Sequence, residues 1–186
     1  MTQSPKPAPA LMVWVDMEMS GLEPERDVIL EIATVLTDGH LNIIAEGPEL
    51  VIHQEPQLYD LMDDWNKEHH SKSGLWSQVL ASKVTVEEAE KLTMEFLKKH
   101  TPAKASPLCG NSVHQDRRFI VKYMADFDRY LHYRLVDVST VKELVSRWYP
   151  ESFKFHKKDS SHRAKDDIIE SIEEMKHYRN MAFKPQ

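Results

Sequence analysis

The chain has 186 residues and a mass of 21.7 kDa, which is enough for one domain with a sizeable core and short for two. Hydrophobic residues make up 41% and charged residues 29%, and no apolar run approaches the ~18–20 residues that a membrane span needs. The net charge of −6 argues against a protein that coats long nucleic acid with a basic face, and the single cysteine, Cys109, excludes an internal disulfide and a cysteine-based zinc site.

The N-terminal segment 1–10, MTQSPKPAPA, is rich in proline and contains neither an apolar stretch nor an arginine. It resembles neither a secretory signal nor a good transit peptide, so we expect a disordered tail followed by a single domain over 11–186. This predicts a cytoplasmic protein, with a mitochondrial location as the alternative if a presequence lies upstream.

The first predicted elements are strands. Three apolar, β-rich runs come first: LMVWVD (11–16), VILEIATVLTD (28–38) and LNIIAEGPELVI (41–52). Asp38 and Gly39 separate the last two runs, and both residue types tolerate the positive φ of a tight hairpin turn. We therefore expect an antiparallel meander of two or three strands. Glu31 interrupts the second run, and the sequence leaves open whether it supports a site or forms a structural pair.

Helical periodicity then alternates with short apolar segments. Apolar stripes predict helices around 58–65, 89–96, 119–127, 141–148 and 168–175. Between them, PLCG (107–110) and YRLVD (133–137) are predicted strands. Strands that alternate with helices imply parallel crossovers added to the meander, which predicts a mixed α/β sheet with helices on its faces.

Two carboxylates, Asp16 and Glu18, end the first run. Side chains at i and i+2 of a strand point to the same face, so the two acids converge. Burying them side by side is costly unless something neutralises them, because each raises the cost of ionising the other. The alternative is that the strand has ended by Val15 and that both acids are solvated.

A third acid, Asp116, lies in the first turns of the helix that follows the strand 107–110. It precedes Phe119 and Ile120 by three and four residues, so it projects from the apolar stripe and needs a partner. The alternative is an acid that favours the helix dipole or forms a salt bridge with Arg117 or Arg118.

The last helix supplies a fourth acid. Ser160 or Ser161 can cap this helix. At about 100° per residue, Asp166 points nearly opposite the apolar stripe whereas Asp167 lies at its border, so Asp167 is the better candidate for a site at the sheet surface. His162 stands at the start of the helix and could lie beside Asp167; the alternative is an ordinary exposed histidine.

Together these residues predict a metal centre. Four carboxylates, from Asp16, Glu18, Asp116 and Asp167, offer the hard oxygen ligands that suit Mg²⁺ or Mn²⁺. Two such ions about 4 Å apart clamp a phosphate for in-line displacement, and a neutral His162 can take the proton from the attacking water. The cations would also neutralise the buried acids.

The order Asp16-x-Glu18, Asn111-x₄-Asp116 and His162-x₄-Asp167 resembles the DEDDh class of 3′→5′ exonucleases, which have a ribonuclease H-like fold. The sequence is similar above all to the oligoribonuclease family, over nearly all of 12–180. The segments that carry this similarity are WVDMEMSGL, EGPELVIHQ, MDDWNKEHHSKSGL, GNSVHQDRRF, HYRLVDVST and SHRAKDDIIESI. The resemblance implies a homodimer that hydrolyses very short RNA, preferentially 5′-phosphorylated dinucleotides, to nucleoside 5′-monophosphates.

A 5′-phosphate pocket can be argued from the residues themselves. Arg134, expected on a strand, offers a bidentate fork, and Ser139 and Thr140 lie at a helix N-terminus, where free amides favour anions. Ser139 also fits the N-cap position of that helix. The resemblance adds Ser112 and His70 to this cap.

Three hydrophobic residues gain a role only from the resemblance. It implies that Leu22 wedges between the two bases, that Trp65 packs against the substrate and that Tyr133 reaches the site from the partner subunit. The alternative for Leu22 and Trp65 is a place in the core. Two rival functions remain: a proofreading-type exonuclease acting on long strands, and an inactive oligonucleotide-binding module, which the five intact catalytic residues disfavour.

Overall fold

The computed structural model describes residues 11–156 and 163–183, and the predicted tail 1–10, Ser160, Ser161 and His162 lie outside these ranges. A five-stranded sheet with the order β3-β2-β1-β4-β5 forms its centre. Its strands are β1 (Met12–Met19), β2 (Ile29–Thr37), β3 (Ile43–Val51), β4 (Leu108–Gly110) and β5 (Leu135–Asp137). The first three strands pair antiparallel, whereas β1–β4 and β4–β5 are parallel, which confirms the predicted mixed sheet.

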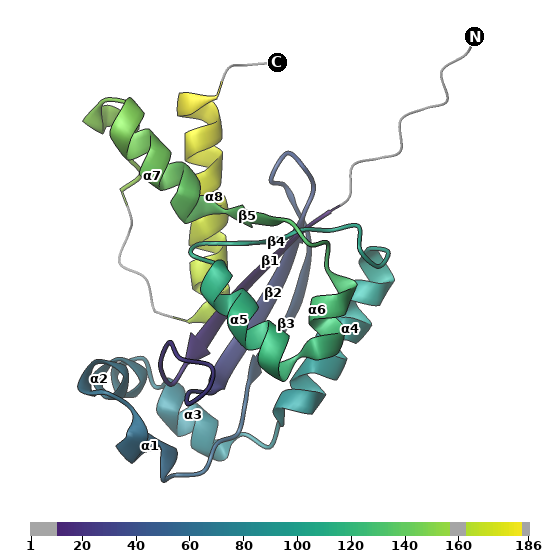
Figure 1. The fold of residues 1–186 in the computed structure, drawn as a ribbon, viewed down its shortest axis with the longest axis vertical. Coiled ribbons are helices and arrows are strands. Elements are labelled where there is room, and N and C mark those ends of the chain that lie inside the picture. The colour runs from purple at the N-terminus through teal and green to yellow at the C-terminus, as the bar shows by residue number, and fades with distance from the viewer. Residues whose placement is uncertain (1–10, 157–162, 184–186) are drawn as a thin grey trace.

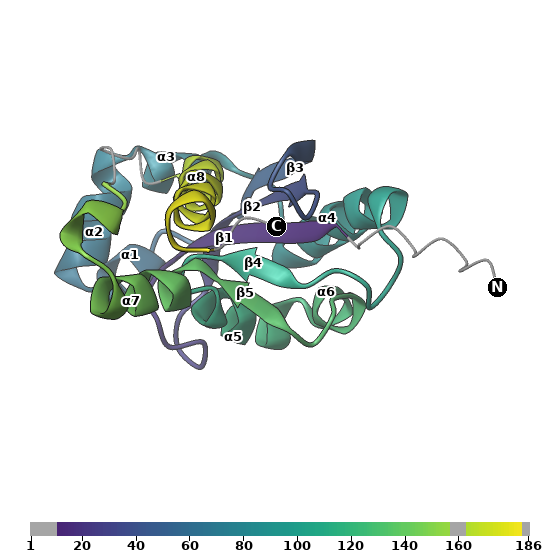
Figure 2. The ribbon, with the colours of Figure 1, turned by 90° about the horizontal axis from the view of Figure 1, so that it is seen from above.

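Helices cover both faces of the sheet (Figures 1 and 2). One face packs on α7 (Val138–Trp148) and α8 (Ala164–Ala182), and the other packs on α4 (Val86–His100), α5 (His114–Tyr123) and α6 (Ala125–Tyr130). Near the end of β1 lie three short helices, α1 (Leu58–Leu61), α2 (Asp64–Lys72) and α3 (Leu75–Ala81) (Figure 1). A 3₁₀ turn, η1 (Glu151–Phe153), follows α7.

Alternation along β1 decides which side chains meet α8. Val13, Val15 and Met17 are buried in the core on the α4–α6 side, whereas Trp14 is buried against α7 and α8. Because successive strand residues point to opposite faces, Asp16 and Glu18 continue the face that Trp14 begins. The two acids are therefore presented to α8.

The β2–β3 connection is the hairpin predicted at Asp38 and Gly39, since the two strands pair antiparallel. The Asp38 carboxylate accepts hydrogen bonds from the backbone N–H of His40 (2.8 Å) and of Asn42 (2.9 Å), which closes a wider loop. Positive φ occurs at Leu41 (70°) and not at Gly39. The predicted hairpin is thus confirmed, whereas the positive φ lies at Leu41, because the aspartate side chain shapes the loop.

Two predicted helices are broken in the structure. The stripe over 58–65 is divided between α1 and α2, because Met62 is extended (ψ 152°), and the stripe over 119–127 is divided between α5 and α6 at Met124 (φ −136°, ψ 63°). The predicted strand 133–137 begins only at Leu135, so Arg134 precedes β5 instead of lying on it. Within the described residues, no helix is long and apolar enough to cross a membrane.

Candidate active site

Three carboxylates converge where β1 meets the start of α8. One oxygen from each of Asp16, Glu18 and Asp167 lies within 4.8 Å of the other two. β1 supplies the first two side chains, and the first turn of α8 supplies the third. Asp166 is exposed and Asp167 is half-buried, which is the difference in exposure that the helical wheel predicts.

The fourth predicted acid adjoins this cluster from the other side of β1. Asp116 lies in the first turn of α5 and is only 5% exposed. Burial raises its pKa to about 8, although a backbone hydrogen bond from Met17 of β1 opposes the shift. After burial, the charge of Asp116 is the next cause that raises the pKa of Asp16, although Asp116 is not one of the three acids whose oxygens lie within 4.8 Å of one another.

Burial and mutual repulsion make these acids hard to ionise. Burial raises the pKa of Asp16 well above its usual range, and Asp116, Glu18 and Asp167 raise it further. Burial raises the pKa of Glu18 to about 8, with Asp167 as the next cause. Crowded carboxylates without a matching cation are unfavourable, and an all-oxygen donor set fits a hard divalent cation such as Mg²⁺ or Mn²⁺.

The raised pKa values predict how stability depends on pH. A carboxyl such as Glu18, with a pKa of 4.5 raised to about 8, holds its proton more tightly in the folded chain. The stabilisation is fully present below the unfolded pKa and is lost as the pH rises through about 8. We expect the thermal midpoint of the metal-free chain, followed by circular dichroism, to fall by roughly 5–10 °C between about pH 5 and pH 8.5.

A Glu18→Gln variant is the control for this prediction, because it removes one of the raised groups and should flatten the pH dependence. Added Mg²⁺ should restore the midpoint at the alkaline end, since ion binding to the folded chain stabilises it. A midpoint of the metal-free chain that rises with pH over this range would contradict the description of the cluster.

His70 lies against the same end of β1. Its ring is 1% exposed, Nε2 lies 2.9 Å from the backbone oxygen of Met19, and Nδ1 lies 3.9 Å from Oε2 of Glu18. Burial lowers the pKa of His70, which favours a neutral ring that donates from Nε2. Nδ1 then remains a buried acceptor without a hydrogen-bond partner among the described residues, directed toward the acidic cluster.

A cavity of about 480 Å³ adjoins Glu18. Leu22 and Trp65 line it and are 57% and 65% exposed, so the alternative that they belong to the core is wrong. The Trp65 ring stacks on His69 with a centroid distance of 4.4 Å. Four polar residues that no sequence pattern singled out also line the cavity: Glu23, Arg26, Asp63 and Asn66.

The loop that carries Leu22 is held on both sides. The buried Asp27 carboxylate accepts a hydrogen bond from the Glu23 backbone N–H (2.9 Å). Gly21 packs so closely on Asp27 that an added Cβ would lie 2.4 Å from Oδ2. On the other side, Arg118 of α5 donates to the Leu22 carbonyl oxygen (3.0 Å). These contacts fix Leu22 at the mouth of the cavity, and only the folded chain brings them together.

The predicted phosphate cap contains an unexpected carboxylate. The backbone N–H groups of Ser112 and Ser139 both donate to Oδ1 of Asp137 at 3.0 Å, and Ser112 Oγ donates to Ser139 Oγ at 3.2 Å. Asp137 is thus the N-cap of α7, and the assignment of Ser139 to that position was wrong. Arg134 and Thr140 are exposed.

The predicted cap residues form two separate groups within this chain. Ser112 and Ser139 meet each other after the ends of β4 and β5, whereas His70 contacts the end of β1. Among the described residues, no hydrogen bond or ion pair joins the two groups. Tyr133 is 76% exposed and stacks on His132 at 4.4 Å, so its ring is presented outward.

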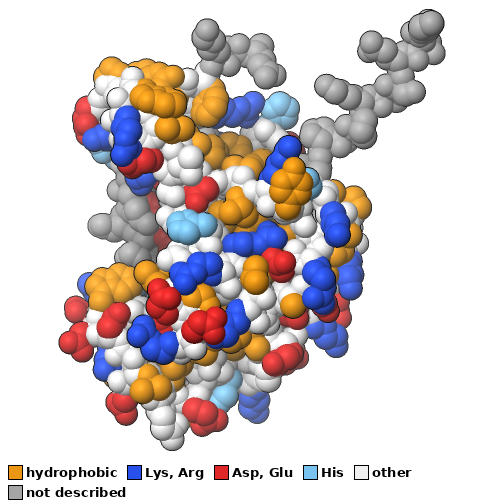
Figure 3. Space-filling view, in the orientation of Figure 1, with side chains coloured by type: hydrophobic (Ala, Val, Ile, Leu, Met, Phe, Trp, Pro, Cys, Tyr) orange, Lys and Arg blue, Asp and Glu red, His pale blue; other side chains and the backbone are white. Residues whose placement is uncertain are grey.

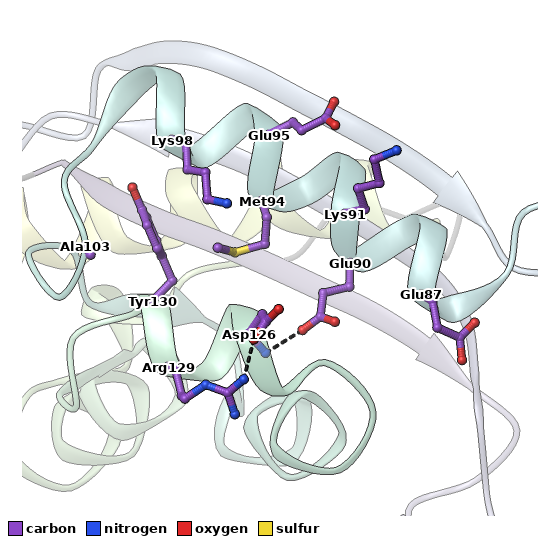
Figure 4. Close-up of a pocket in the computed structure, with 10 residues that line it drawn as sticks. All are labelled: Glu87, Glu90, Lys91, Met94, Glu95, Lys98, Ala103, Asp126, Arg129 and Tyr130. Carbon is purple, nitrogen blue, oxygen red and sulfur yellow. Dashed lines mark hydrogen bonds and ion pairs between the residues drawn. The ribbon is translucent and has the colours of Figure 1, made fainter.

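A larger cavity of about 700 Å³ lies away from the acidic cluster, between α4 and α6 (Figure 4). The Glu90 carboxylate accepts from the backbone N–H of Asp126, and Arg129 pairs with Asp126 (Figure 4). Glu90 also accepts from the backbone N–H of Phe127. These polar groups already serve the packing of α4 on α6. The convergent carboxylates therefore identify the candidate active site better than cavity size does.

The last helix does not begin with a serine cap. α8 begins at Ala164 with Arg163 at the N-cap position, so the prediction of a cap at Ser160 or Ser161 was wrong. Glu31, left open from the sequence, is fully buried and forms an ion pair with Arg163.

Comparisons with known proteins agree with this geometry. The chain matches the Exonuclease family model over residues 13–175. It is 55% identical over 174 residues to the mitochondrial oligoribonuclease of Homo sapiens, covering 93% of this chain and 73% of the human protein. It is 53% identical over 170 residues to the oligoribonuclease of Ruthia magnifica subsp. Calyptogena magnifica, covering 91% and 94% of the two chains.

The fold is also found among solved exonucleases. E. coli Exonuclease I in complex with a dA16 oligonucleotide superimposes with a TM-score of 0.71 at 14% sequence identity. The match covers 93% of this chain and 41% of that protein. Together with the mixed five-stranded sheet, it establishes the ribonuclease H-like exonuclease fold.

Proposed function

Because the chain belongs to the oligoribonuclease family of exonucleases, we propose that it prefers 5′-phosphorylated dinucleotides among its short RNA substrates. The chain is a metal-dependent 3′→5′ exoribonuclease that acts on short oligoribonucleotides. The observation that carries the assignment of the site is the convergence of the Asp16, Glu18 and Asp167 carboxylates within 4.8 Å.

We assign Asp16, Glu18, Asp116 and Asp167 as the ligands of two divalent ions, Mg²⁺ or Mn²⁺. All four side chains offer oxygen donors, and burial raises the pKa of Asp16, Glu18 and Asp116. Two bound ions of this kind neutralise such carboxylates and supply positive charge at the scissile phosphate.

His162 is assigned as the general base. It lies outside the described residues, directly before Arg163 at the start of α8, the helix that carries Asp167. The imidazole nitrogen takes a proton from a water whose oxygen attacks phosphorus, while the bond between phosphorus and the 3′-oxygen breaks. The 3′-oxygen gains a proton from solvent, and the products are a nucleoside 5′-monophosphate and a strand ending in a 3′-hydroxyl.

Short substrates follow from the cavity and the cap. Leu22 and Trp65 border a cavity of about 480 Å³, which is a suitable size for a few rings and not for a long strand. We assign the 5′-phosphate to His70, Ser112, Arg134, Ser139 and Thr140. Asp137 already accepts the backbone N–H groups of the two serines and the Ser139 hydroxyl (2.5 Å), and the Ser112 hydroxyl donates to Ser139 Oγ, so recognition of the phosphate charge rests mainly on the Arg134 guanidinium.

An Arg134→Ala variant tests the cap. Hydrogen bonds to charged groups contribute about 1.5–3 kcal/mol, so KM for the 5′-phosphorylated dinucleotide should rise roughly 10–100-fold. KM for the same dinucleotide with a 5′-hydroxyl should change little. Arg129→Ala, which removes an exposed arginine that pairs with Asp126, is the control. Equal effects on both substrates would contradict the assignment of Arg134.

We also propose a homodimer in which Tyr133 contributes to the partner's site. The support is its 76% exposure beside His132 and Arg134, which gives it no place in the core of its own chain. If light scattering gave a stable and fully active monomer, the role across the interface would fail.

We further propose that 11–186 forms one exonuclease domain, that the protein is cytoplasmic, and that a mitochondrial location is the alternative.

The substrate-length profile tests the proposed function directly. Turnover of a 5′-phosphorylated dinucleotide should exceed that of a 5′-phosphorylated heptamer at least about tenfold, because a closed cap cannot hold a longer chain. The face in Figure 3 shows acidic and basic side chains intermixed, which favours local recognition of a short substrate. A flat length profile would favour the proofreading-type exonuclease, and binding without release of mononucleotide would favour the inactive module.

A further inference from the structure

Glu31 is a charged residue in an unusual position. It lies near the start of β2, is 0% exposed, and pairs across the strands with Glu18 of β1. Partners in register share a face, so Glu31 points to the side of the sheet that α8 covers. A buried carboxylate beside Glu18 is costly without a cation and hydrogen-bond donors.

Arg163 supplies that cation through a planar fork. Its Nε lies 3.0 Å and 3.1 Å from the two oxygens of Glu31, and Nη2 donates to Oε1. Nη2 also donates to Gln78 Oε1 at 3.1 Å. The guanidinium is therefore bound from two sides in a site where only one fifth of its side chain is exposed.

The Glu31 carboxylate also caps α8. Arg163 occupies the N-cap position without a side-chain capping bond, and Glu31 Oε2 instead accepts from the Ala164 backbone N–H at 3.1 Å. One turn later, the Asp167 backbone N–H donates to the Arg163 carbonyl oxygen at 3.1 Å. A single hydrogen-bonded turn thus joins the buried ion pair to Asp167.

We propose that Glu31 and Arg163 are positioning residues that hold Asp167 against Asp16 and Glu18, so that the cluster binds divalent cations. The pair fixes the start of α8 on β2, and the first helical turn carries Asp167 to the end of β1. This inference rests on the proposed function, because it presumes that the acidic cluster binds metal.

A positioning role and a purely electrostatic role predict opposite effects of an Arg163 substitution on cation affinity. By charge alone, Glu31→Gln removes a negative charge near the cluster and weakens cation binding, whereas Arg163→Gln removes a positive charge and strengthens it. By positioning, either change frees the start of α8, so both weaken cation binding. Arg163→Gln therefore separates the two explanations.

The experiment is a calorimetric titration of Mn²⁺ into the metal-free full chain. We expect Glu31→Gln and Arg163→Gln each to weaken Mn²⁺ binding about tenfold or more, as is typical for groups that orient metal ligands. Lys165→Gln is the matched control. This substitution removes a positive charge from the same turn of α8. Lys165 Nζ lies 2.6 Å from Oε2 of Glu46 on β3, and both side chains are partly exposed. The control should change the affinity less than about twofold.

Tighter binding in Arg163→Gln, or unchanged binding in both variants, overturns the inference. Circular dichroism checks that each variant is folded at the temperature of the titration. If Arg163→Gln does not fold, Arg163→Lys keeps the charge but lacks the fork, and its affinity should still fall; an unchanged affinity overturns the proposal. If the wild-type chain does not bind Mn²⁺, both the proposed metal centre and this inference are refuted. If the wild-type chain binds Mn²⁺ and the variants bind it equally well, only the inference is refuted.

Discussion

Asp16→Asn is expected to abolish RNA hydrolysis while the metal-free chain stays folded. The substitution removes a carboxylate from the cluster with Glu18 and Asp167 without removing core volume. Loss of metal-derived charge at the phosphate should lower kcat at least about 10³-fold, even at saturating Mg²⁺. The metal-free variant should melt above the wild type at alkaline pH, because a repelling buried charge is gone.

Asp166→Asn is the control for this substitution. Asp166 lies beside Asp167 in the sequence but is exposed, so its neutralisation should change kcat less than about twofold. An Asp16→Asn variant with near-normal turnover at saturating Mg²⁺ would exclude Asp16 as a metal ligand.

His162→Ala is expected to lower kcat about 10²–10⁴-fold while Mn²⁺ binding stays unchanged. A general base must be neutral to accept a proton. The kcat of the wild type should therefore fall at acidic pH, where the imidazole becomes protonated. The variant should lack this step in its pH profile.

His156→Ala is the matched control, because His156 is an exposed histidine that precedes the same helix. It should keep both the rate and the acidic step of the pH profile. If His162→Ala retained the acidic step with only a small loss of rate, another group would be the base.

The central features of the site could be predicted from local patterns. Asp16 and Glu18 share a face because of the two-residue repeat of a strand, and Asp167 was separated from Asp166 by the 3.6-residue repeat of a helix. Both arguments require only the periodicity of the strand or helix in which the residue lies. The mixed sheet was predictable for the same reason, since short strands alternating with amphipathic helices follow an initial meander.

Features that depend on distant contacts could not be predicted. The partner of Glu31, Arg163, lies 132 positions away, and only the packing of α8 on β2 brings the two together. Likewise, Leu22 is exposed at a cavity because Arg118 and Asp27 hold its loop. Hydrophobicity alone suggested a core residue. Such loop positions are determined by tertiary hydrogen bonds that leave no periodic signal in the sequence.

The capping residues show a second limit. Ser139, Ser160 and Ser161 belong to a residue type that favours N-caps, but Asp137 and the distant Glu31 carboxylate perform the capping instead. The preference of a residue type for the N-cap position locates the start of a helix within a few residues. Which nearby acceptor binds the free backbone N–H groups of that helix depends on the tertiary fold.

The most direct test of the central claim is to incubate a 5′-phosphorylated RNA dinucleotide with the full chain and Mg²⁺, and to separate the products by anion-exchange chromatography. The reaction is repeated with a chelator and again after Mg²⁺ is restored. We predict complete conversion to nucleoside 5′-monophosphates, loss of the reaction on chelation and its recovery with Mg²⁺. Hydrolysis that persists in the chelator, or a nucleoside 3′-monophosphate as product, would contradict a metal-dependent attack of water at the acidic cluster.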